Sequence, residues 1–166
     1  MERLAPSHPI TLTEMLPWAT KLPSRRAELG LCYGMTDTPS ASMRGLARRL
    51  LVVEAASRSA AGPHIHEVVR VCEKLQIFTT RFAGSDGFAS LLRRALALAR
   101  AENPSLGTVK LKPGGSLDGC EALGIDGPEG AVAIIAHLLG LLETFVGEPF
   151  TIRLVRQAWP DASLDS

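Results

Sequence analysis

The stretch AVAIIAHLLGLLETFV, residues 131–146, decides the fold, because only His137, Glu143 and Thr144 in it carry clearly polar side chains. Its sixteen residues are fewer than the about 20 that a membrane-crossing helix needs, and Glu143 would be costly in lipid. A helix that is apolar on nearly all sides is typical of the centre of a soluble core. The sequence therefore predicts a central helix from Gly130 to about Val146.

Small residues form a stripe along this helix, since Ala133, Ala136 and Gly140 fall close together on one face. Another helix can approach such a stripe unusually closely. That helix can belong to the same chain or to a second copy, because the core of an obligate dimer uses the same pattern.

Four more helices are predicted around the central one, because apolar residues recur at helical spacing between breaks at proline and glycine. They cover about 38–59, 65–82, 85–102 and 149–159. Thr38 is expected to cap the first of them, with Pro39 in its first turn, and Gly84 is expected to end the second.

Side-chain burial is predicted in the first and the last of these four helices. In the last one, Arg153, Arg156 and Gln157 are expected outside, and the apolar residues inside: Phe150, Ile152, Leu154, Val155 and Trp159. In the first one, Glu54 and Arg58 stand four residues apart, in the order that stabilises a helix by about 0.2–0.5 kcal/mol if the pair is exposed.

The remaining segments are less regular. Residues 1–37 contain repeated prolines and are interpreted as an arm packed on the domain, with a short helix that starts at the capping-box pair Thr11 and Glu14. Residues 105–125 alternate apolar and polar side chains around a proline–glycine turn, which predicts a small β-hairpin or an ordered loop. Residues 161–166 are interpreted as a polar tail.

These elements together predict an all-α fold, a compact bundle of five or six helices with the hairpin or loop inserted around 105–125. With no internal repeat or low-complexity linker, residues 1–160 are expected to form a single domain. In a chain of 166 residues one core can bury roughly 70% of the surface of the unfolded chain, so folding needs no disulfide or metal.

The net charge of +1 conceals a division along the chain. Residues 1–36 carry four basic and three acidic side chains, residues 37–100 carry ten and five, and residues 101–166 carry four and nine. Such opposed charges can pair within one chain or between chains. We therefore predict an interaction surface built from basic and acidic side chains: Arg44, Arg48, Arg49, Arg93, Arg94, Asp118, Glu121 and Asp126.

Motifs that carry chemistry are scarce, since the sequence has no GxSxG, no Walker A pattern and no GxGxxG. His64, His66 and Glu67 are weak candidates for metal ligands, because histidines two positions apart on a helix point about 200° away from each other. We therefore expect no metal and no cofactor. Cys120, in a glycine-rich loop, is a better candidate for a reactive thiol than Cys72, which lies in an apolar run.

The function that fits these observations is a non-catalytic protein–protein interaction module, an adaptor or regulatory subunit that binds a protein partner or copies of itself. Two alternatives stay open: a metal-dependent or cysteine-based enzyme domain, and a nucleic-acid-binding regulator with an arginine-bearing helical face. An isoelectric point of 7.8 and few aromatic residues disfavour nucleic acid, and the sequence identifies no small-molecule substrate.

The expected location is the cytoplasm. Cys32, Cys72 and Cys120 lie far apart and are odd in number, which does not fit a disulfide framework. The N-terminal residues lack the continuous apolar stretch of a secretory signal, and no transmembrane segment is expected.

Overall fold

The computed structural model describes residues 38–57, 66–124 and 128–162. Every described residue belongs to one compact unit, Asp37–Ser166. The single domain expected over residues 1–160 therefore stays a prediction.

Several predicted features lie outside the described residues. They are the N-terminal arm with its short helix, Cys32, Arg58, His64, Asp126 and residues 163–166 of the tail.

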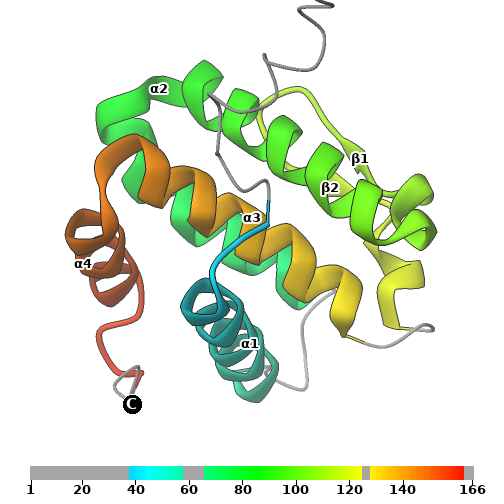
Figure 1. Ribbon diagram of the computed structural model, residues 1–166, viewed down its shortest axis with the longest axis horizontal. Coiled ribbons are helices and arrows are strands. Elements are labelled where there is room, and N and C mark those ends of the chain that lie inside the picture. The colour runs from blue at the N-terminus through cyan, green and yellow to red at the C-terminus, as the bar shows by residue number, and fades with distance from the viewer. Residues whose placement is uncertain (1–37, 58–65, 125–127, 163–166) are drawn as a thin grey trace, which may run out of the picture. The chain divides into compact units, whose positions relative to one another are not determined.

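The described residues are mostly helical, as predicted (Figure 1). The α-helices are α1 (Ala41–Ala56), α2 (Glu67–Glu102), α3 (Glu129–Val146) and α4 (Glu148–Ala158). Between α2 and α3, the 3-10 helices η3 (Pro104–Thr108) and η4 (Cys120–Gly124) flank an antiparallel pair of strands, β1 (Lys110–Leu111) and β2 (Leu117–Asp118). The expected number of five or six helices is not confirmed, since the described residues form four α-helices.

α1 begins later than predicted, because Ser40 and not Thr38 is its N-cap. The Ser40 hydroxyl accepts a hydrogen bond from the backbone N–H of Met43 at 3.3 Å, which satisfies a donor that the first helical turn leaves without a partner. Pro39 consequently precedes the helix. There it lies against Gly140 of α3, where a Cβ would be 3.5 Å from the Pro39 Cβ, so the small-residue stripe of α3 receives a proline at this point.

α2 contains the break that the sequence predicts at Gly84. This residue has φ 72° and ψ 171°, a backbone region that is open essentially to glycine alone. Helical structure resumes at once, so the two predicted helices form one kinked element. The helix starts at Glu67, slightly later than predicted, because His66 is its N-cap and accepts a hydrogen bond from the N–H of Val68.

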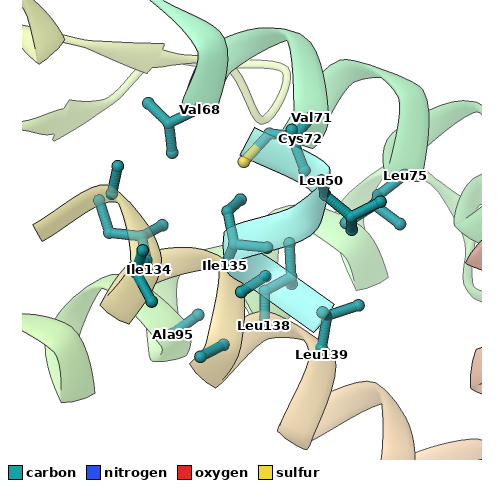
Figure 2. Packing of buried hydrophobic residues seen from close by; sticks show 14 of the residues in the cluster. Leu50, Val68, Val71, Cys72, Leu75, Ala95, Ile134, Ile135, Leu138 and Leu139 are labelled. Carbon is teal, nitrogen blue, oxygen red and sulfur yellow. The ribbon is translucent and has the colours of Figure 1, made fainter. Parts of the chain in front are cut away.

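α3 packs against α1, α2 and α4 at the centre of the described fold, as predicted (Figure 1). Figure 2 shows Leu50 of α1 and Leu75 of α2 in one apolar cluster with Ile135 and Leu138 of α3. Each fully buried leucine or isoleucine of this kind contributes about 1.5–3 kcal/mol by leaving water. The cluster therefore dominates the stability of the fold.

α3 has 18 residues, two more than the quoted stretch, and its mean hydropathy is 1.6. Among the described helices, α3 alone is long and apolar enough to cross a membrane. This corrects the prediction that it is too short. Yet 61% of it is buried inside the fold, and the core helix of a soluble protein passes the same test. The burial is consistent with a soluble protein.

The predicted hairpin is present in the segment between α2 and α3. Lys110 pairs with Asp118 and Leu111 with Leu117. The turn between the strands is fixed to α2, since the Gln76 amide donates a hydrogen bond of 2.7 Å to the carbonyl oxygen of residue 114.

α4 follows α3 after Gly147, whose φ of 86° ends α3 as predicted. Leu154, Val155 and Trp159 are buried, as expected, but Phe150 is 44% exposed. The prediction that Phe150 faces the core is therefore wrong. Helical periodicity gives the direction of a side chain but not how far the core extends: residues 148–150 at the start of α4 are exposed, and burial begins at Thr151.

Candidate interaction surface

Two of the predicted surface arginines are paired inside the chain. Arg44 donates to both carboxylate oxygens of Glu102, at 2.8 and 2.7 Å, and Arg48 donates to both oxygens of Glu129, at 3.1 Å. Each pair joins the basic segment 37–100 to the acidic segment 101–166. Part of the charge division is thus satisfied within one molecule.

The Arg44–Glu102 pair extends inward to His137 of α3, a buried residue whose Nε2 lies 3.0 Å from Oε1 of Glu102. Burial raises the pKa of the Glu102 carboxyl, but the hydrogen bonds from Arg44 and the charge of His137 lower it more, so the net pKa is below its ordinary value. This group connects α1, the end of α2 and α3, and it explains why α3 carries a histidine in its apolar sequence.

The other predicted surface residues are distributed over several elements. Arg93 and Arg94 are exposed on the second segment of α2, whereas Arg49 is half-buried on α1. Asp118 lies 2.9 Å from Nζ of Lys112 across the hairpin, and the hydrogen bond from Lys112 lowers the pKa of this carboxyl. Glu121 is exposed on η4.

Two of the three candidate metal ligands, His66 and Glu67, lie at the start of α2. Nδ1 of His66 is 3.4 Å from the N–H of Val68 and 3.5 Å from Oε2 of Glu67. A nitrogen that accepts from an N–H carries no proton, so the cap is the interaction that fits a neutral imidazole. In 38–57, 66–124 and 128–162, no group of three His, Cys, Asp or Glu side chains is arranged to hold a metal ion.

Cys72 and Cys120 are both free and buried. Desolvation by burial raises the pKa of Cys72 far above its ordinary value, and Cys120 adds to this shift. Burial, assisted by the charges of Glu121 and Asp118, raises the pKa of Cys120 to about 11. Neither thiol is activated as a nucleophile, because reactivity requires a lowered pKa and access to solvent.

Glu54, which the sequence only pairs with Arg58 on the helix, is buried in the fold and 2% exposed. Its Oε1 accepts a hydrogen bond of 2.7 Å from the indole N–H of Trp159 and another from Lys74. Arg70 lies on the other side, with Nε 3.5 Å from Oε2, and the Lys74 ammonium is 5.3 Å from the centre of the Trp159 ring. Glu54 therefore attaches the end of α4 to α1 and α2.

α4 forms one wall of a surface groove of about 300 Å³, and α2 forms the other. We call it the α2–α4 groove, and its lining is Phe78, Arg81, Phe82, Phe150, Arg153, Leu154 and Gln157. Phe82 and Phe150 are 40% and 44% exposed. Their rings meet edge to face with centroids 5.4 Å apart, an arrangement that aromatic pairs prefer.

Among the described residues that line the groove, the charged ones are two arginines, Arg81 and Arg153. The Arg81 guanidinium stacks over the Phe78 ring at 5.2 Å. Arg153 is exposed and forms no ion pair with another described residue. The groove thus combines apolar rings with positive charge.

The groove was not predicted, although the sequence carries a signal for part of it. Phe78, Arg81 and Phe82 recur at helical spacing of three and four, which places them on one face. That this face meets Phe150 and Arg153 depends on how α4 packs, which local patterns do not specify.

A larger hollow of about 490 Å³ lies between α1 and the starts of α2 and α3, and its lining is mainly apolar. Its polar groups include Arg48 and His66, whose pairing with Glu129 and role as helix cap are described above. Both residues therefore already have a partner within this chain.

No family model, curated protein or solved structure matches this chain, so the surface is interpreted from its own residues.

Proposed function

We propose that this chain is a non-catalytic protein–protein interaction module, an adaptor or regulatory subunit, and that it docks its partner in the α2–α4 groove. The observation that carries this proposal is the exposed Phe82–Phe150 pair in a groove bordered by two arginines. Aromatic residues and arginine are enriched in protein interfaces, whereas most of the predicted charged surface is solvated or internally paired.

Exposed rings of this kind support docking on energetic grounds. Fully burying a phenylalanine contributes about 1.5–3 kcal/mol, so covering the exposed parts of Phe82 and Phe150 contributes about 2 kcal/mol. Rings already packed on each other lose little side-chain entropy on binding. A partner that covers both rings therefore gains more binding free energy than one that binds scattered surface charges. Exposed ion pairs contribute only about 0–1 kcal/mol each.

The two alternative functions have less support. The buried thiols of Cys72 and Cys120 do not favour a cysteine-based enzyme, and His66 as a helix cap does not favour a metal-dependent one. Arg44 and Arg48, on which nucleic-acid binding would depend, are paired with carboxylates.

Self-association, a cytoplasmic location and a bundle of five or six helices also remain proposals. Sedimentation of the purified chain over a hundredfold range of concentration tests self-association. A single monomeric species throughout would restrict the partner to another protein.

Photo-crosslinking in living cells tests the proposed docking site. A photoreactive amino acid replaces Gln157, which lines the groove, or Arg93, which is exposed on the second segment of α2. We expect one defined adduct from position 157, lost when Phe82→Ala and Phe150→Ala are added, and none from position 93. An adduct from position 93 alone would overturn the assignment of the groove.

A further inference from the structure

We propose that the α2–α4 groove receives an apolar side chain carried by an acidic segment of a partner protein. This inference rests on the proposed function and adds the chemistry of the partner to it.

The apolar part of the inference follows from the shape and lining of the groove. Its volume of about 300 Å³ corresponds to about ten water molecules at about 30 Å³ each. The floor and walls include Phe78, Phe82, Phe150 and Leu154. An inserted leucine or phenylalanine would displace this water and cover the exposed rings, which is the usual way an anchor residue fills a pocket.

The acidic part follows from the charges at the groove. Arg81 and Arg153 line it, and no carboxylate is among its described lining residues. The stacking of Arg81 on Phe78 holds one guanidinium in a defined orientation. Guanidinium groups bind carboxylates with paired hydrogen bonds. Glutamate or aspartate residues on either side of the anchor would therefore form ion pairs with both arginines.

A protein segment fits this site better than an anionic bilayer. Phe82 and Phe150 pack on each other within a groove between two helices, whereas interfacial membrane binding uses apolar side chains that project from a helix into the lipid. Glu148 is exposed at the start of α4, two residues before Phe150. Its negative charge would be repelled by a uniformly anionic lipid surface. A peptide can place its acidic residues opposite the arginines alone.

Binding of designed probes to the full-length protein tests the inference. The first probe is a fluorescent 16-residue amphipathic peptide with a leucine stripe flanked by glutamates. Matched probes carry lysines in place of the glutamates, or serines in place of the leucines. A fourth probe is a vesicle of phosphatidylserine and phosphatidylcholine. Each is titrated by anisotropy or co-sedimentation against the wild type, Arg153→Glu, Phe82→Ala and, as a control away from the groove, Arg93→Glu.

We expect the glutamate–leucine probe to bind most tightly. Arg153→Glu should weaken binding of the glutamate–leucine probe at least fivefold and strengthen binding of the lysine probe. Phe82→Ala should weaken binding of both of these probes, and Arg93→Glu should change the affinity of neither by more than twofold. Equal binding of the glutamate and lysine probes, or no binding of either peptide, would overturn the inference. Vesicle binding that depends on Arg153, without peptide binding, would assign the groove to membranes instead.

The crosslinking experiment separates this inference from the proposed function. If position 157 crosslinks to a partner segment without acidic residues, the docking function stands and the acidic chemistry is wrong. If position 157 gives no adduct and no peptide binds, both fail.

Discussion

Replacing Glu54 with alanine is expected to destabilise the fold by about 3 kcal/mol. The buried N–H of Trp159 loses its acceptor, which costs about 1–3 kcal/mol, and one buried methylene is removed at about 0.8 kcal/mol. Lys74 and Arg70 are 41% and 25% exposed and can rehydrate, so their ion pairs add only about 0–1 kcal/mol. The variant no longer has a carboxylate to desolvate, so we expect the lower end of the about 3–5 kcal/mol typical for removing one partner of a buried pair.

Two matched variants separate the causes of this loss. Glu54→Gln keeps the packing and an oxygen that accepts from Trp159 but lacks the charge, so it should cost about 1 kcal/mol, the difference between charged and neutral hydrogen bonds. Glu73→Ala removes an exposed carboxylate from α2 and should change stability by less than about 0.5 kcal/mol.

Urea unfolding followed by far-ultraviolet circular dichroism measures the free energy of unfolding of each protein. The dependence of the unfolding free energy on urea concentration must be the same in all variants before their unfolding midpoints are compared. Equal costs for Glu54→Ala and Glu54→Gln would show that charge rather than the Trp159 hydrogen bond and packing matters. A cost below about 1 kcal/mol for Glu54→Ala would refute the attachment of α4 through this carboxylate.

Two further predictions follow from backbone geometry and from pH. Gly84→Ala should destabilise by about 1–3 kcal/mol, because φ 72° and ψ 171° strain any other residue, although a Cβ there has nothing within 4 Å. Gly45→Ala, equally open but inside α1, should stabilise by about 0.5–1 kcal/mol; urea unfolding that ranks the two in the opposite order would contradict the kink at Gly84. The lowered pKa of Glu102 means that the folded state holds this proton less tightly than the unfolded state, so the stabilisation is present above pH of about 4.3 and lost as pH falls through the folded pKa. The stability difference between wild type and Glu102→Gln should therefore shrink between about pH 6 and pH 3, and a difference independent of pH would exclude the ionised carboxylate as its cause.

The features predicted from sequence are those encoded locally. The apolar stretch around Ile134 and Leu138 predicts a core helix because no exposed helix tolerates such a composition. Gly84 predicts a break because its conformation is open to glycine. The alternating residues near Leu111 predict a strand because side chains alternate along it.

The features that were missed depend on residues far apart in the chain. Glu54 stands four residues before an arginine, so a local rule places it at the surface, but its acceptor oxygen binds Trp159, 105 positions away. Phe150 likewise meets Phe82 only because α4 packs beside α2. Periodicity gives the face of each helix, whereas the contacts between faces decide burial and create the groove.

We propose that a partner docks in the α2–α4 groove and not on the predicted charged surface. The decisive test is a titration of the isotopically labelled protein with the glutamate–leucine probe, followed by amide chemical shifts. We expect the largest shifts at residues 78–82 and 150–157. Shifts centred on Arg44, Arg48 and Arg93, or no shifts up to millimolar probe, would contradict it.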